Sequence, residues 1–159
     1  MSAKLGVKVV APLASVAFLD TNIFVYAFLT NEPRKRSRAV ELIESALGSG
    51  KGCISYQVVQ EFANVACKKF ATSMSPTDCK AFIEAAMQPM NRVASSTPLV
   101  YAALDLQSEL GYSFYDCLML AAALEAGAVT LYSEDLQHWQ LVRGTLRIVN
   151  PFLDTVHEN

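Results

Sequence analysis

Four acidic residues stand where apolar runs of strand character give way to predicted helices. Asp20 follows the first such run and Asp135 follows the fourth, while Glu61 lies in the first two turns of the helix after the second run. Asp116 lies in the first turn of the helix before the fourth run. In an open α/β sheet, ligands bind outside the carboxyl ends of the strands, so acids at these junctions are expected to share one crevice. The position of Asp116 is the least determined, because its helix runs back towards the fourth strand.

Carboxylates that share a crevice repel one another and raise one another's pKa unless a cation lies between them. Clusters of oxygen ligands suit Mg²⁺ or Mn²⁺. These ions stabilise both the attacking and the leaving oxygen when a phosphodiester is hydrolysed. The grouping therefore predicts metal-dependent hydrolysis of a phosphodiester.

Each acid also has a structural interpretation that needs no chemistry. Asp20 and Asp135 are suitable helix caps, and Glu61 is suitable as a solvated helix residue. Asp116 is the third-position acid of the capping box Ser113-Phe114-Tyr115-Asp116. Taken singly, the structural interpretations are at least as good, and it is the grouping of four acids that favours a site.

Short strand-like runs alternate with longer helical patterns, which predicts parallel strands joined by crossover helices. The predicted strands are Val16 to Asp20, Cys53 to Ser55, Arg92 to Ala94, Val129 to Tyr132 and Arg147 to Val149. The predicted helices are Thr21 to Leu29, Pro33 to Leu47, Tyr56 to Phe70, Pro76 to Met87, Pro98 to Leu110, Phe114 to Ala126 and Leu136 to Leu141. Ser75 and Thr97, each followed by proline, are predicted helix caps.

The chain has 159 residues, which fits one domain, and 52% of them are hydrophobic. This fraction predicts a large core or a buried partner face. The net charge is −2, whereas a dedicated nucleic-acid binder is typically strongly basic. If four of the 15 acids bind metal, however, 11 remain against 13 lysines and arginines.

The four cysteines are scattered without a C-x-x-C pair, which predicts reduced thiols in a cytoplasmic protein. Two histidines cannot build a His-rich zinc site. The early apolar run is interrupted by Pro12 and is too short to span a bilayer, so no membrane segment is predicted.

Three further features favour structure over function. The stretch Gly48 to Gly52 fails as a phosphate-binding loop because it precedes a strand, so it is predicted to be a helix-ending turn. The basic run Arg34-Lys35-Arg36 with Arg38 is predicted to be a solvated face, with RNA phosphate contact as the alternative. The aromatic residues at helical spacing are predicted to lie in the core: Phe24, Tyr26, Phe28, Phe62, Phe70 and Phe82.

From Val16 to Phe152 the chain resembles PIN-domain ribonucleases, and within them the VapC-like toxins of prokaryotic type II toxin–antitoxin pairs. The resemblance is carried by Leu19-Asp20-Thr21-Asn22, by Glu61, by Ser113-Phe114-Tyr115-Asp116 and by Ser133-Glu134-Asp135-Leu136. It implies a three-layer α/β/α sandwich with a five-stranded parallel sheet. Residues 1–15 would form an N-terminal extension, residues 16–153 a single nuclease domain and residues 154–159 a C-terminal tail.

The resemblance also implies a function. Asp20, Asp116 and Asp135 would bind Mg²⁺ or Mn²⁺, with Glu61 binding metal directly or through water. Asn22 and Ser133 would support the acids. The implied protein is an endoribonuclease toxin with an RNA substrate, an antitoxin partner and a homodimeric state. One departure is His138-Trp139, where the family often has a glycine; Trp139 is therefore expected to alter the substrate cleft.

Two other functions remain possible on the sequence. The first is a catalytically silent PIN-like module that binds RNA or protein, against which the intact set of four acids argues. The second is a phosphoacceptor receiver domain, which is also α/β with an acidic metal pocket. It is disfavoured because no lone acceptor aspartate ends a central strand.

Overall fold

The computed structural model describes residues 13–68 and 74–154, and these form a sheet of six strands in the order β3-β2-β1-β4-β6-β5. The strands are β1 (Ala17–Leu19), β2 (Gly52–Ser55), β3 (Asn91–Val93), β4 (Thr130–Tyr132), β5 (Leu141–Val142) and β6 (Leu146–Val149). Five strands run parallel, as predicted. The sixth, β5, pairs antiparallel with β6 and was missed in the sequence.

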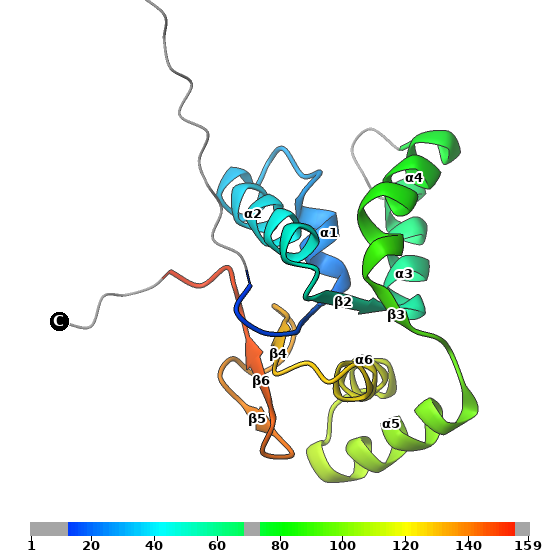
Figure 1. Ribbon diagram of the computed structural model, residues 1–159, viewed down its shortest axis with the longest axis vertical. Coiled ribbons are helices and arrows are strands. Elements are labelled where there is room, and N and C mark those ends of the chain that lie inside the picture. The colour runs from blue at the N-terminus through cyan, green and yellow to red at the C-terminus, as the bar shows by residue number, and fades with distance from the viewer. Residues whose placement is uncertain (1–12, 69–73, 155–159) are drawn as a thin grey trace, which may run out of the picture.

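Helices cover both faces of this sheet, so the predicted three-layer α/β/α sandwich is confirmed. They are α1 (Thr21–Tyr26), α2 (Pro33–Ser49), α3 (Tyr56–Lys68), α4 (Pro76–Phe82), α5 (Thr97–Leu110) and α6 (Phe114–Glu125). Figure 1 shows α1 and α2 on one side of the sheet and α5 and α6 on the other, with α3 and α4 beside β2 and β3. The predicted end of α3 at Phe70, most of the N-terminal extension and most of the C-terminal tail lie outside the described residues.

Burial in the core explains why the sequences of the central strands are unbroken apolar runs. Strands of a parallel sheet are buried on both faces, and every residue of β1 is buried. On the α1 side, Phe82 contacts Phe28 and Phe62 at ring-centroid distances of 4.8 and 5.0 Å. Phe24 and Phe62 are fully buried, and Tyr26, Phe28 and Phe82 are partly buried against the core. The prediction is confirmed for these five aromatic residues, and Phe70 lies outside the described residues.

The segment from Leu136 to Leu141 was predicted to be a helix, and this prediction was wrong. The chain bends there and enters the hairpin of β5 and β6. Trp139 adopts a left-handed backbone with φ 72°, which an α-helix does not accommodate. Its N–H donates to the Ile148 carbonyl at 2.7 Å, and the Ile148 N–H donates to the Gln140 carbonyl at 2.9 Å. These hairpin bonds replace the helical ones.

Other boundaries differ by smaller amounts. Helix α1 ends at Tyr26, three residues before its predicted end, and α4 passes at Phe82 into a π-helical turn, η1 (Ile83–Met87), followed by the 3₁₀ turn η2 (Gln88–Met90). Helix α5 is capped by Ser96, whose hydroxyl accepts from the Leu99 N–H at 3.2 Å, and not by Thr97.

The turn at Gly48 to Gly52 has the predicted role of ending a helix. Gly50 takes φ 66° at the end of α2, a backbone that favours glycine. Gly52 then opens β2 in a tight space, because a Cβ atom there would lie 2.4 Å from Cβ of Ala46. The residues of this turn are therefore explained by packing.

Two further observations concern the cysteines and the hydropathy of the helices. All four cysteines are free thiols, as predicted. Over residues 13–68 and 74–154, none of the helices combines the length and the hydropathy needed to cross a bilayer.

Candidate active site

Asp20, Glu61, Asp116 and Asp135 line one cavity of about 260 Å³. Asp20 directly follows β1, Asp135 lies three residues after β4, and Glu61 is in the second turn of α3 after β2. Because these three strands are parallel neighbours, their carboxyl ends meet at one edge of the sheet. The structure thus brings together all four acids that the sequence singled out.

Asp116 reaches the same cavity for a topological reason that the sequence analysis overlooked. Helix α6 leads into β4, which runs parallel to β1. To enter β4 at its amino end, α6 must run from the carboxyl edge of the sheet to the opposite edge, so its first turn starts at the carboxyl edge. The Asp116 N–H donates to the Ser113 hydroxyl at 3.2 Å, so the predicted cap is also present.

Asp20 is both a helix cap and the most buried acid of the cavity. Its Oδ1 accepts from the Thr21 N–H at 2.6 Å and its Oδ2 accepts from the Ser133 hydroxyl at 2.7 Å. The pKa of Asp20 is raised to about 6, chiefly by burial and also by the nearby Asp135 and Glu61, against the lowering effect of its two hydrogen bonds. Binding of either a proton or a cation stabilises a buried carboxylate that lies beside other carboxylates.

Asp135 is exposed and is held by the polar residues that the sequence predicted to support the acids. Asn22 donates from Nδ2 to Oδ2 of Asp135 at 2.8 Å, and the Asp135 N–H donates to the Ser133 hydroxyl at 3.3 Å. Burial and then the charges of Glu134 and Asp116 raise the pKa of Asp135, while Asn22 lowers it. Ser133 thus lies between Asp20 and Asp135 and orients both.

Two residues that orient Glu61 were not singled out from the sequence. The Thr21 hydroxyl donates to Oε2 of Glu61 at 2.7 Å, and Gln57 donates from Nε2 to Oε1 at 2.8 Å. The same Gln57 nitrogen donates to the Tyr115 carbonyl at 3.3 Å. The available signal for Gln57 was its position four residues before Glu61, which places both on one face of α3.

The chemistry of these residues suits a hard divalent cation. All four acids offer oxygen, the donor that Mg²⁺ and Mn²⁺ prefer. The hydrogen bonds to Asp20 and Glu61 come from neutral donors and leave lone pairs on the carboxylate oxygens. Within the described part of the chain, however, no three Asp, Glu, His or Cys side chains are gathered tightly enough to hold an ion as they stand. Binding would therefore draw the carboxylates closer together.

The basic run on α2 lies apart from this cavity. Lys35 forms an ion pair with Glu134 at 2.5 Å, Arg34 pairs with Asp154, and Arg38 donates to the Pro151 carbonyl at 3.3 Å. These three side chains line a separate cavity of about 850 Å³. Trp139 lines that cavity and not the acidic one, and its effect on the substrate cleft stays a prediction.

Comparison with protein families gives a match to the PIN domain over residues 17–142. The chain belongs to the PIN domain family. The matched segment begins in β1 and ends in β5, so it contains all four acids of the cavity. A sequence comparison with curated proteins finds no significant match.

Solved structures with a similar fold include three toxins or toxin–antitoxin complexes. A toxin–antitoxin complex from Klebsiella pneumoniae has a chain 20% identical, with a TM-score of 0.62 over 85% of this PIN domain chain and 97% of its own. VapBC2 from Rickettsia felis, bound to a DNA fragment from its promoter, is 20% identical, with a TM-score of 0.55 over 84% and 98%. VapC20 from Mycobacterium tuberculosis, a Sarcin-Ricin loop cleaving toxin, is 17% identical, with a TM-score of 0.55 over 75% and 89%. At these identities the likeness establishes the PIN fold.

Proposed function

We propose that this PIN domain is a divalent-metal-dependent endoribonuclease and the toxin of a toxin–antitoxin pair. The observation that carries the proposal is the shared cavity of Asp20, Glu61, Asp116 and Asp135, four acids drawn from separate segments of the chain. VapC20, a structural neighbour, is a toxin that cleaves the Sarcin-Ricin loop. An RNA phosphodiester is thus the proposed substrate.

In this proposal the four acids hold Mg²⁺ or Mn²⁺ at the carboxyl edge of the sheet. The bound ion would supply charge neutralisation and a more acidic water for in-line attack on phosphorus. The residues of the chain fix where this occurs. Ser133 and Thr21 hold the Asp20 carboxylate, Asn22 holds Asp135, and Thr21 and Gln57 hold Glu61. Such prior orientation lowers the cost of organising charge during the reaction.

The direct test is cleavage of a generic RNA by the purified protein with Mn²⁺ or Mg²⁺. We expect cleavage that EDTA abolishes and that Asp135→Asn reduces at least a hundredfold. Asp105→Asn, at an exposed position of α5, is a matched control, because it removes the same charge at a site outside the acidic cavity. Activity that survives exhaustive chelation contradicts the metal mechanism. RNA binding without cleavage at any metal concentration would instead indicate a silent binding module.

The antitoxin partner follows from the same proposal. Two structural neighbours are toxin–antitoxin complexes, from Klebsiella pneumoniae and Rickettsia felis. We expect expression of the chain to arrest growth of a bacterial host and expression of Asp20→Asn to be harmless. A small DNA-binding protein encoded beside this chain should restore growth and form a stable complex with it. Growth arrest by the parent and the variant alike would contradict a nuclease toxin.

A homodimer in the cytoplasm completes the proposal. On α5, Tyr101 is 62% exposed and Leu104 is 47% exposed, and at a spacing of three they share one helix face. Such side chains suit burial against a second copy of the chain. Light scattering should give twice the mass of one chain.

A further inference from the structure

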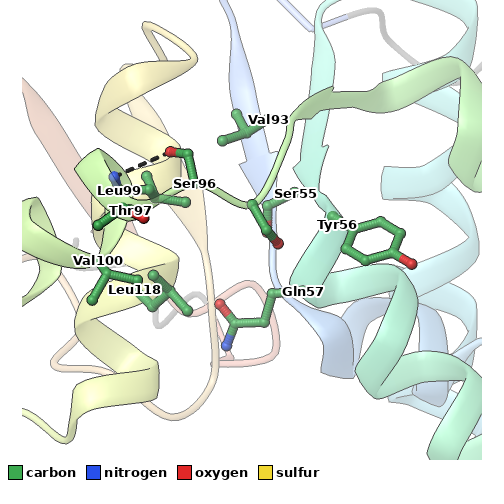
Figure 2. A pocket seen from close by; sticks show the side chains of 10 residues that line it. Ser55, Tyr56, Gln57, Val93, Ser96, Thr97, Leu99, Val100 and Leu118 are labelled. Atoms are coloured by element: carbon green, nitrogen blue, oxygen red, sulfur yellow. Dashed lines mark hydrogen bonds between the residues drawn. The ribbon is translucent and has the colours of Figure 1, made fainter.

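A third cavity, of about 380 Å³, lies directly beside the acidic one, and Gln57 lines both. It is formed by the end of β2, the start of α3, the end of β3 with the segment that follows it, the start of α5 and one residue of α6. Figure 2 shows Gln57 facing Leu118 across the hollow, with Val93 and Ser96 at one end. We call it the Gln57 pocket. Its volume is within the range of small-molecule sites in proteins.

Two buried polar atoms of this pocket lack a hydrogen-bond partner within the described residues. They are the Ser55 hydroxyl oxygen and Oε1 of Gln57. Ser55 is 2% exposed and Gln57 is 9% exposed. Burying such a group without a partner costs free energy, so each unpaired atom requires a reason.

The orientation of the Gln57 amide is fixed by its other end. Nε2 donates to the Glu61 carboxylate and to the Tyr115 carbonyl, both of which are acceptors only. Exchanging the amide oxygen and nitrogen would set oxygen against these two oxygens. The acceptor Oε1 is therefore held away from the acidic cavity, on the side of the Gln57 pocket.

The lining of the pocket contains no acidic or basic side chain. Val93, Leu99, Val100 and Leu118 supply apolar surface. Tyr56, which is 48% exposed, lies at the edge of the pocket, and in Figure 2 its ring points away from Leu118 and Ser96. A metal ion would find no carboxylate here to hold it. A flat, neutral ligand with N–H donors at its edge fits these groups.

We propose that the Gln57 pocket binds one nucleobase of the RNA substrate, and this inference rests on the proposed ribonuclease function. Single-stranded RNA is recognised by hydrogen bonds to the edges of unstacked bases and by stacking on aromatic side chains. Oε1 of Gln57 accepts from an N–H of the base, and the Ser55 hydroxyl pairs with a second edge atom. Tyr56, at the edge of the pocket, stacks on a neighbouring base. The two unpaired atoms thereby gain their partners.

The geometry also links recognition to the acids. The same amide that meets the base through Oε1 orients Glu61 through Nε2. The bound base therefore lies one amide group away from the acidic cavity, beside the phosphodiester to be cut. A base that fits would hold Gln57, and with it Glu61, in place.

The first test measures nucleoside binding by NMR of the ¹⁵N-labelled full chain. Adenosine, guanosine, cytidine and uridine are titrated separately, and the side-chain amide signals of Gln57 and the backbone signal of Ser55 are followed. At least one nucleoside should shift these signals. Val100→Phe fills the pocket with a ring and should therefore weaken the binding of that nucleoside about tenfold, the effect of losing one base contact. Ser108→Ala, at the far end of α5, is the control and should bind like the parent.

No shift with any nucleoside would overturn the proposal. A shift produced only by N-acetyl-leucinamide would also overturn it and would indicate a pocket for a side chain of a protein partner. Because this measurement needs no cleavage, it decides the inference even if the proposed nuclease activity fails.

The second test sequences the products of cleavage of a random RNA pool. Ser55→Ala and Val100→Phe should change the base preference at one position near the cut by about tenfold. Ser108→Ala should preserve it. Cleavage with the same preference in all four proteins would overturn the base pocket while leaving the ribonuclease proposal intact. A variant that unfolds is recognised by its melting curve, and the nucleoside titration of the parent then decides.

Discussion

The Ser133 hydroxyl donates to Oδ2 of Asp20 at 2.7 Å, although 113 residues separate them in the sequence. Both residues are buried at the carboxyl edge of the sheet. The same hydroxyl oxygen accepts from the Asp135 N–H at 3.3 Å. One serine thus connects the segment after β4 to the residue that follows β1, and it stabilises the ionised form of the most buried acid.

Replacing Ser133 by alanine should destabilise the protein more at pH 8 than at pH 5. The lost bond goes to a buried carboxylate that is charged at pH 8, and such a bond is worth about 2 kcal/mol. Below pH 6 much of Asp20 is protonated, so the substitution lowers the free energy of unfolding by less. Urea unfolding in EDTA at both pH values measures the difference. Ser108→Ala, an exposed serine on α5, is the control, and equal losses for Ser133→Ala at the two pH values would contradict the prediction.

Asp20→Asn should abolish cleavage yet melt at or above the parent in EDTA. Burial raises the pKa of Asp20 from 3.8 to about 6. At about 1.4 kcal/mol per unit, the ionised form costs the fold about 3 kcal/mol at neutral pH. Asparagine removes this charge and still accepts from the Thr21 N–H. A variant that melts well below the parent would mean that Asp20 acts only as a structural cap.

Added Mg²⁺ should raise the melting temperature of the parent and have little effect on Asp20→Asn. At a hundredfold excess over its Kd, a ligand that binds only the folded state stabilises it by about 2.7 kcal/mol. Differential scanning fluorimetry with Mg²⁺ and with EDTA measures the shift. An equal shift in the melting temperature of both proteins would show that Asp20 does not bind the metal.

The contribution of Asp20 to stability should fall as the pH rises from about 4 to about 6. Its pKa is raised in the folded state, so folding favours the protonated acid. This contribution is fully present below pH 3.8 and is lost once the pH exceeds 6. The free-energy difference between the parent and Asp20→Asn, measured in EDTA across this window, isolates the effect from other titrating groups. A difference that stays constant with pH would show that Asp20 is not the group responsible.

Thr21→Val should lower the turnover rate about tenfold and the melting temperature by a few degrees, whereas Thr21→Ser should keep the activity of the parent. Valine keeps the shape of threonine but cannot donate to Oε2 of Glu61. The expected loss corresponds to about 1.4 kcal/mol, the value of one hydrogen bond to a charged group. Single-turnover cleavage of RNA gives the rates. Equal activity in all three proteins would indicate that Glu61 needs no orientation by Thr21.

Tyr101→Glu should convert the proposed dimer into a monomer without loss of fold. Tyr101 is exposed on α5 and its replacement removes no buried contact. A charge at the centre of an apolar interface disfavours association. Light scattering of the parent and the variant checks the mass, with Glu109→Gln at the other end of the helix as the control. A monomeric parent at every concentration contradicts the dimer itself.

The parallel strands could be predicted from strong local signals, whereas the four acids were singled out by their grouping, since each alone could be a helix cap or a solvated residue. Buried strands such as β1 are unbroken apolar runs, and acids at the ends of parallel strands must meet at one edge. The hairpin of β5 and β6 could not be predicted, because two residues are too few to show an alternating pattern. The segment from Leu136 to Leu141 was predicted to be a short helix, and nothing local revealed the left-handed backbone of Trp139.

The polar residues that orient the acids could be predicted only in part from the sequence. Asn22 and Ser133 were found because they belong to the motifs that carry two of the acids. Gln57 was missed because a glutamine on an amphipathic helix is commonly exposed, and only tertiary packing buries it here. Its unpaired Oε1 is a property of three-dimensional structure alone.

The antiparallel strand β5 changes how this sheet presents its edge. Beyond β6, the edge is a strand of only two residues at the start of a tight hairpin. So short an edge exposes few backbone N–H and C=O groups to an incoming chain. Another polypeptide therefore finds no useful template for strand addition there. The hairpin therefore disfavours continuous sheets between copies of the chain.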